Sequence, residues 1–356
     1  MVLTTAVIGA GTVSIDHLSA LKRNPQTEPV AVCDVDEERA REAAREYGIS
    51  AYTDIDRVLS TDLDWVHVCT PVQTHLEVGL RAINAGVPAM IEKPITLTSD
   101  EFEKLQSVAR TNAVQVFPVH NWLFYPVIRR LRANVAAGQI GRVIGVDILF
   151  NGMTRPNEAN RGSWVFDLAG GEFEEALPHP IYLTLAIGGY PKSRQEIAAI
   201  TNLIGTYDIN VSYDSAQVQY VGKNGRMCGM TMLSGEFPQR YVSVYGTEGM
   251  VVADLISGTL SVIDENYHRS PFHGVKKNLD TAVNHLGHAA DAPSRFTQMF
   301  MEHKLGRHSE RSVSGHYSLI NLTAKSLLTN SDPPVSLEQA GQTIGVMEEI
   351  RNSASE

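Results

Sequence analysis

The first 120 residues alternate between two hydrophobic patterns, and this alternation restricts the fold more than any other feature of the chain. Short runs in which nearly every residue is apolar predict strands, as in residues 5–9, 30–33 and 65–69. Longer runs with apolar residues at helical spacing separate them, as in residues 15–24 and 75–86. Strands that are apolar on both faces are typical of a parallel sheet with helices on both sides. We therefore expect a doubly wound α/β domain.

The pattern changes after about residue 122. Apolar runs such as residues 141–151 and 227–233 predict strands, and Lys-Asn-Gly at 223–225 and Gly-Thr-Glu-Gly at 246–249 predict hairpin turns. Residues 179–189 predict an apolar helix. These features indicate an α+β domain built on a large, mostly antiparallel sheet.

We therefore predict two domains in the 356 residues, which is enough chain for two cores. The first covers residues 1–121 and the second, for substrate binding and oligomerisation, covers residues 122–356. A capping box formed by Ser336 and Gln339 predicts a C-terminal helix at about 336–352, which can pack back on the first domain. Residues 265–295 are polar and contain histidines, which favours a loop or a mobile cover.

Charge and cysteine content exclude several classes of protein. The net charge of −10 argues against a protein that binds nucleic acid or an anionic membrane surface. Three cysteines do not form a disulfide framework. We find no signal peptide and no apolar run near the ~20 residues that a membrane span needs. We expect a cytoplasmic protein with neither nucleic acid nor membrane as a partner.

A glycine turn follows the first predicted strand and opens the first predicted helix. Gly9 permits the tight turn, and Gly11 lets the backbone approach a pyrophosphate at the positive end of the helix. The third glycine position of a dinucleotide motif holds Ser14, which is small enough to keep the helix close to the strand. We expect Gly9, Gly11, Thr12 and Val13 to bind the pyrophosphate of a dinucleotide in a Rossmann domain. A doubly wound domain without a ligand is the alternative.

An acidic residue ends the second predicted strand. The carboxylate of Asp34 can accept both hydroxyls of an adenosine ribose and would repel a 2′-phosphate. Val35 and Asp36 offer no arginine for that phosphate. The sequence therefore favours NAD over NADP.

Residues 69–101 contain a further set of motifs, namely Thr70-Pro71, His75 and Glu92-Lys93-Pro94. With the glycine turn, this set resembles the glucose-fructose oxidoreductase / inositol dehydrogenase / rhizopine-catabolism (Gfo/Idh/MocA) family. The resemblance runs nearly end to end, through residues 141–148, 245–254 and 332–354. It implies a Rossmann domain, a substrate domain, and a dimer or tetramer of the chain. It also places Thr70, Pro71, His75, Glu92 and Lys93 beside the cofactor.

The family's second domain supplies a stretch that ends in Asp-x-x-x-His. Here Gly170 and Gly171 precede the matching stretch, His179 matches the histidine, and Glu175 replaces the aspartate. Residues four apart on a helix face the same side, so both side chains can line one cleft. The substitution keeps the charge and adds one methylene group, which leaves the role of the carboxylate open.

The resemblance also implies that Asn121 and Trp122 lie near the substrate. Family members often carry arginines in the neighbourhoods that Leu123, Phe124 and Val165 occupy here. The pocket is then expected to be more apolar than that of a simple polyol dehydrogenase. Packing between the domains is the alternative for these aromatic and apolar residues.

The reversible oxidation of a secondary alcohol needs a hydride acceptor and a base, and the resemblance assigns both. NAD supplies the first. Lys93, held away from water beside a positively charged ring, favours the neutral amine that can take the hydroxyl proton. His179 is the rival base or a partner of the same hydroxyl, with Glu175 orienting it or binding a neighbouring hydroxyl. Glu92 is expected near the nicotinamide ribose or orienting Lys93, and His75 is expected to pack or to touch the cofactor.

We therefore expect an NAD-dependent oxidoreductase that interconverts a secondary alcohol and a ketone on a sugar, an inositol or a sugar derivative. An NAD-dependent glycosidase that uses transient oxidation, and a regulator that binds NAD and a sugar without turnover, are the alternatives. We expect no metal site, because the spacings of the later histidines do not form a ligand set. We expect them all on the surface or in loops: His268, His273, His285, His288, His303, His308 and His316.

Overall fold

A computed structural model of the chain describes residues 1–152, 154–264 and 315–354, together with isolated residues between 272 and 297. The described residues form two compact units. The first unit contains residues 1–124, 161–164 and 315–348, and the second contains the remaining described residues. The predicted cover at 265–295 lies almost entirely outside the described residues.

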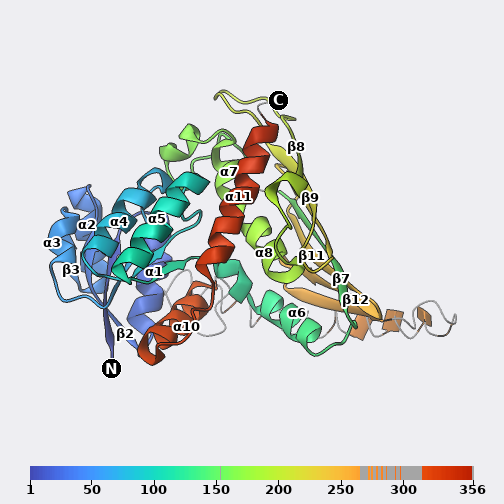
Figure 1. Cartoon of the computed structure of the whole chain (residues 1–356), viewed down its shortest axis with the longest axis horizontal. Helices are drawn as coiled ribbons and strands as arrows, with labels where there is room; N and C mark the ends of the chain where they lie inside the picture. The colour runs from blue at the N-terminus through green and yellow to red at the C-terminus, as the bar shows by residue number, and fades with distance from the viewer. Residues whose placement is uncertain are drawn as a thin grey trace. The chain divides into compact units, whose positions relative to one another are not determined.

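The first unit contains a six-stranded parallel sheet (Figure 1). Its order is β3 (Ser50–Tyr52), β2 (Thr27–Cys33), β1 (Leu3–Ile8), β4 (Trp65–Val68), β5 (Ala89–Ile91) and β6 (Val116–Pro118). This is the order of a Rossmann fold, in which the strand sequence reverses between β1 and β4. The predicted parallel sheet is confirmed, and β3 is an added strand.

Local sequence signals mark two helix ends in the first unit. Gly48 ends one helix with a φ of 67°, a left-handed conformation that glycine adopts without strain. The Thr98 side chain accepts a hydrogen bond from the backbone N–H of Glu101. The helices that follow the strands are α1 (Thr12–Arg23), α2 (Glu37–Tyr47), α3 (Ile55–Leu59), α4 (His75–Asn84) and α5 (Ser99–Asn112).

Two helices from the end of the chain complete this unit, α10 (His316–Thr329) and most of α11 (Leu337–Ser353). α10 packs against α1 and against the 3-10 turn η2 (Asn121–Phe124). Ala340 and Ile344 of α11 belong to the same core cluster as Phe102. The compact unit extends to Phe124, and the chain returns to it near its end.

The second unit contains a seven-stranded sheet (Figure 1). Its order is β13 (Thr259–Asp264), β12 (Gly249–Asp254), β11 (Gln239–Gly246), β7 (Val143–Asn151), β10 (Met227–Leu233), β9 (Ser215–Val221) and β8 (Ala198–Asn202). Only the β7–β10 pair is parallel among these strands, so the sheet is mostly antiparallel, as predicted. The predicted hairpin turns join β9 to β10 and β11 to β12.

Helices of the second unit pack on this sheet. The predicted apolar helix is α8 (Pro178–Gly188), which contacts β7 and β10. α6 (Pro126–Ala136) contacts β12 and β13. The shorter helical elements are α7 (Gly171–Ala176) and the 3-10 turns η1 (Val72–Thr74), η3 (Ser163–Asp167) and η4 (Arg194–Glu196), of which η1 belongs to the first unit. Among the helices described, none is both long enough and apolar enough to cross a bilayer.

Candidate active site

The glycine turn joins β1 to α1, and its two glycines are required for different reasons. Gly9 has a φ of +98°, and a Cβ atom there would lie 2.6 Å from the carbonyl oxygen of Cys69. Gly11 is the N-cap residue of α1, and a Cβ atom there would meet nothing within 4 Å. Packing within the chain therefore explains Gly9 but not Gly11. Gly11 lies at the positive end of α1, a position at which helices commonly bind phosphate groups.

Asp34 follows β2 and lies beside this turn, as the sequence predicts. Its Oδ2 atom accepts a hydrogen bond of 2.7 Å from the backbone N–H of Ala10, and its Oδ1 atom accepts one of 2.9 Å from Asp36. The carboxylate is half-buried. The two residues of the turn that follow Gly11 start α1, with Thr12 exposed and Val13 half-buried.

His75 connects the loop after β4 to the loop after β5. One ring nitrogen lies 2.8 Å from the carbonyl oxygen of Thr70, and the other lies 2.9 Å from that of Pro94. The ring is buried, and this burial lowers its pKa. These contacts fit the packing role that was one of two expectations for His75. Thr70 and Pro71 are half-buried beside it.

Lys93 follows β5 and is only 8% exposed. Its backbone N–H donates a 3.0 Å hydrogen bond to Oε2 of Glu92, and the Lys93–Pro94 peptide bond is cis. The strands β1, β4 and β5 are neighbours in the parallel sheet, so their carboxyl ends lie on one edge. The structure therefore brings Gly9, Thr70 and Lys93 to the same edge of the first unit.

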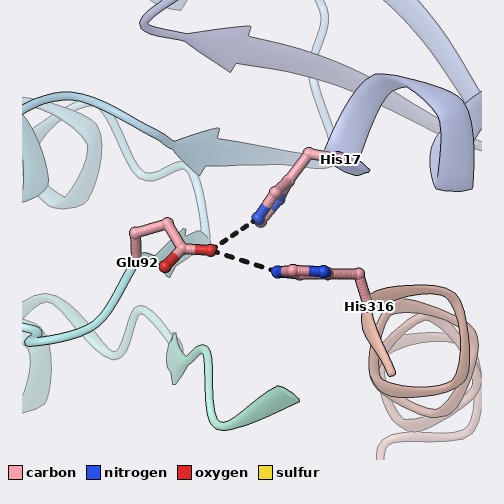
Figure 2. Close-up of side chains that lie close together, drawn as sticks. All are labelled: His17, Glu92 and His316. Atoms are coloured by element: carbon pink, nitrogen blue, oxygen red, sulfur yellow. Dashed lines mark hydrogen bonds and ion pairs between the residues drawn. The ribbon is translucent and has the colours of Figure 1, made fainter. Parts of the chain in front are cut away.

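Glu92 lies within a histidine cluster rather than in solvent (Figure 2). Its Oε1 atom lies 2.9 Å from Nε2 of His17 and 3.5 Å from Nε2 of His316. Burial alone would raise the pKa of the Glu92 carboxyl, but the hydrogen bonds and the charge of the two rings hold it well below its usual value. Since Oε2 accepts the Lys93 N–H, both carboxylate oxygens have partners within the chain. A contact of Glu92 with a cofactor stays a prediction.

The prediction that His316 is a surface or loop residue is wrong. It begins α10, is buried, and lies with His17 and Glu92 in a group whose ligand atoms are all within 4.8 Å of one another. The sequence could not show this group, because its members come from α1, from the loop after β5 and from the far end of the chain. The other later histidines, namely His268, His273, His285, His288, His303 and His308, lie outside the described residues.

Two further groups surround this cluster. His67, in β4, places its Nδ1 atom 2.7 Å from Nδ1 of His17, and burial lowers the pKa of His67 well below its usual value. Asp16 places Oδ2 3.7 Å from Nδ1 of His316. Burial opposes a charge on His316, but the carboxylates of Asp16 and Glu92 outweigh it and raise the pKa of this ring. The sequence analysis identified neither His17 nor His67 as a site residue, and the position of His17 two turns into α1 gave no signal.

The predicted residues of the second domain lie in the second unit. Glu175 is in α7 and His179 is in α8, and both are buried. Leu177 between them keeps helical angles, with φ −57° and ψ −33°, so the two short helices are nearly continuous. Nδ1 of His179 lies 2.7 Å from the hydroxyl of Tyr182, a partner that the sequence analysis missed. A tyrosine three positions after a helical histidine was the available signal.

The predicted substrate residues Asn121 and Trp122 lie in η2 of the first unit. Asn121 is buried and Trp122 is half-buried. Leu123, Phe124 and Val165, which stand where relatives often have arginines, are also buried. Packing of these side chains would give the same burial, so the apolar substrate pocket stays a prediction.

The matches to known proteins agree with this architecture. Residues 3–120 match the family described as "Oxidoreductase family, NAD-binding Rossmann fold" (GFO_IDH_MocA). The match covers 118 of the 356 residues, all of them in the first unit. The resemblance inferred from the sequence motifs is thereby confirmed.

Individual relatives extend the comparison within the Gfo/Idh/MocA family. An uncharacterized oxidoreductase of Synechocystis sp. is 32% identical over 44% of this chain and 43% of its own length, so the match spans less than half of that relative. Inositol 2-dehydrogenase of Rhizobium meliloti is 27% identical over 77% of this chain and 82% of its own. The WlbA dehydrogenase of Bordetella pertussis, solved with NADH and UDP-GlcNAcA, superimposes with a TM-score of 0.77 at 17% identity. That alignment covers 100% of this chain and 97% of WlbA, so the two share a fold.

Proposed function

We propose that the chain is an NAD-dependent dehydrogenase that interconverts a secondary alcohol and a ketone on a sugar, an inositol or a sugar derivative. The observation that carries this proposal is the buried Lys93 at the carboxyl end of β5, on the same sheet edge as the glycine turn after β1. In open α/β sheets, ligands bind outside the carboxyl ends of the strands where the strand order reverses.

The residues around the turn fit a dinucleotide. The open space beside Gly11 accommodates the diphosphate, and the first N–H groups of α1, at Thr12 and Val13, can donate to it. Asp34 already lies against Ala10 of the turn and supplies the carboxylate for the adenosine ribose. When bound, NAD supplies the hydride acceptor. The negative charge of Asp34 supports NAD over NADP, because a 2′-phosphate would meet a carboxylate.

Lys93 is the proton acceptor in this proposal. Its low exposure keeps bulk water away from the amine, and its backbone is fixed by the hydrogen bond to Glu92. A lysine amine positioned within reach of a substrate hydroxyl can serve as the general base. His179 and Glu175 are the residues of the second unit proposed to bind or polarise the same substrate. The hydroxyl of Tyr182 orients the imidazole of His179.

The substrate class rests on the relatives. The Rhizobium relative is an inositol 2-dehydrogenase, and WlbA was solved with UDP-GlcNAcA bound. Inositol and the sugar of that nucleotide are polyhydroxylated rings, which supports a substrate of that kind here. We also propose a homodimer or homotetramer, supported by exposed apolar residues on strands of the second unit, Ile144, Ile200 and Met227. Light scattering would measure its mass, and a monomer at micromolar concentration would contradict this assignment.

The test of the proposed function compares Lys93→Met with the matched control Lys104→Met, which changes an exposed lysine of α5. A screen of polyols, aldoses, sugar acids and nucleotide sugars, followed by the absorbance of NADH, identifies the substrate. We expect Lys93→Met to lower turnover at least roughly a hundredfold while NAD still binds, and Lys104→Met to leave turnover unchanged. Full turnover in Lys93→Met would refute the proposal. Bound NAD without net NADH formation, together with release of a sugar, would favour the glycosidase alternative.

Calorimetric titration with NAD and NADP tests Asp34 separately. We expect the parent chain to bind NAD more tightly and Asp34→Ala to lose most of this preference. A preference of the parent for NADP would contradict the role given to the carboxylate.

A further inference from the structure

The cluster of His17, Glu92 and His316 has the composition of a metal-binding site (Figure 2). We propose that these three side chains bind one divalent transition-metal ion of the Zn²⁺ class. The ligand atoms are Nε2 of His17, Nε2 of His316 and Oε1 of Glu92. Two imidazoles and one carboxylate are a donor set that Zn²⁺ accepts, with water in the fourth position.

Two of the three separations in the cluster are close to those around a coordinated ion, and all three ligand atoms lie within 4.8 Å of one another. Zn²⁺ bonds of about 2.0–2.2 Å in tetrahedral geometry separate the ligand atoms by about 3.3 Å. Here Oε1 of Glu92 lies 2.9 Å from the nitrogen of His17 and 3.5 Å from that of His316. Shifts of a few tenths of an ångström would bring the two separations to the expected value. Figure 2 shows both rings directed at the same carboxylate oxygen.

The surroundings of His17 also match those of metal-bound histidines, which usually donate the other ring N–H to a second group. Nδ1 of His17 lies 2.7 Å from Nδ1 of His67, and Nδ1 of His316 faces Asp16 at 3.7 Å. Nδ1 of His316 makes no hydrogen bond, although it is buried. A cation on Nε2 would place a proton on this nitrogen and strengthen its attraction to Asp16.

The protons and charges balance when the ion binds. Both Nε2 atoms must present lone pairs, so His17 carries its proton on Nδ1 and donates it to Nδ1 of His67. The proton of His67 then sits on Nε2, a buried atom that makes no hydrogen bond. Any proton held by an Nε2 atom leaves to solvent. The two positive charges of the ion are matched by the carboxylates of Glu92 and Asp16.

Without an ion, the same atoms form a hydrogen-bond network, in which the Nε2–H groups of His17 and His316 both donate to Oε1 of Glu92. That is the competing description. The metal description also explains why two rings converge on one oxygen of Glu92, while the other oxygen accepts the backbone N–H of Lys93. All three ligands are buried, so the ion would connect α1, the loop after β5 and α10 inside the first unit.

The experiment uses the full chain after dialysis against a chelator and titration with Co²⁺, whose visible absorption reports a low-coordinate site. We expect one Co²⁺ per chain, displacement by Zn²⁺, and a higher melting temperature with Zn²⁺. His316→Ala should weaken binding at least a hundredfold, and His179→Ala, a histidine of the second unit, should keep one ion per chain. If His316→Ala fails to fold, His17→Ala provides the same comparison.

Two results would overturn the proposal. One is the absence of stoichiometric Co²⁺ or Zn²⁺ binding by the folded parent chain, which would leave the hydrogen-bond network as the description. The other is Co²⁺ binding that is unchanged in both ligand variants, which would place the ion elsewhere. Neither readout depends on NAD or on turnover, so the outcome is independent of the proposed dehydrogenase activity.

Discussion

The two glycines of the turn after β1 should show different defects when each is replaced by alanine. In Gly9→Ala, a residue with a side chain must adopt a φ of +98°, which costs about 1–3 kcal/mol. The new Cβ atom would also lie 2.6–2.9 Å from backbone atoms of Cys69 and Thr70. Because backbone must move to relieve this overlap, a further 1–3 kcal/mol or so is expected. The free energy of unfolding should therefore fall by about 2–6 kcal/mol.

Gly11→Ala is the matched control, with a different predicted defect. Its Cβ atom meets nothing within 4 Å. The loss of a glycine N-cap and the lower entropy of the unfolded chain nearly offset each other, so stability should change by less than about 1 kcal/mol. The same Cβ atom fills the space proposed for the diphosphate. NAD binding should therefore weaken by roughly tenfold or more, which corresponds to about 1.4 kcal/mol.

Tryptophan fluorescence in urea measures the stability of the first unit selectively, because all three tryptophans, Trp65, Trp122 and Trp164, belong to it. Isothermal titration calorimetry measures NAD binding to the same variants. The reasoning would be refuted if Gly9→Ala unfolded at the same urea concentration as the parent chain, or if Gly11→Ala bound NAD as tightly as the parent.

Two further predictions concern a buried ion pair and a buried neutral histidine. Arg351→Ala removes the guanidinium whose Nε lies 2.7 Å from Oε1 of the buried Glu174, and should cost about 3 kcal/mol of stability. The pair of the exposed Arg194 and the half-buried Glu349 is the control, since Arg194→Ala should cost less than about 1 kcal/mol. Equal losses of stability in thermal unfolding of the two variants would contradict this. Burial lowers the pKa of His120 to about 3, so below pH 6.5 only the unfolded chain takes up this proton and stability falls. Between about pH 6 and 4, the unfolding free energy of the parent should fall by about 1.4 kcal/mol per pH unit relative to that of His120→Gln. Urea titrations at several pH values measure both free energies. Equal pH dependence in the two proteins would contradict the prediction.

The sequence predicted those parts of the fold that depend on local patterns. Buried parallel strands are apolar on both faces, and glycine caps such as Gly48 have a fixed position relative to the helix. Both features can therefore be recognised from the sequence alone. The strands β3, β8 and β13 were missed. No residue of β3 or β8 is fully buried, so neither presents the apolar run that identifies a strand.

The same distinction between local patterns and distant packing applies to the residues of the site. The glycine turn, Asp34 and Lys93 each follow a predicted strand, and parallel strands bring their carboxyl ends together, so their proximity could be predicted. The contact of Glu92 with His316 could not, because it depends on α10 packing against α1. No local pattern reports which distant helix will fill a position in the core.

The return of α10 to the first unit has a consequence for synthesis of the protein. The N-terminus of a growing chain emerges from the ribosome first, so the strands and helices of residues 1–124 emerge long before α10 does. Until translation has nearly ended, the side of α1 that contacts α10 has no partner from this helix. A nascent chain, or one that terminates before α10, would therefore leave this side of α1 open to chaperones and proteases.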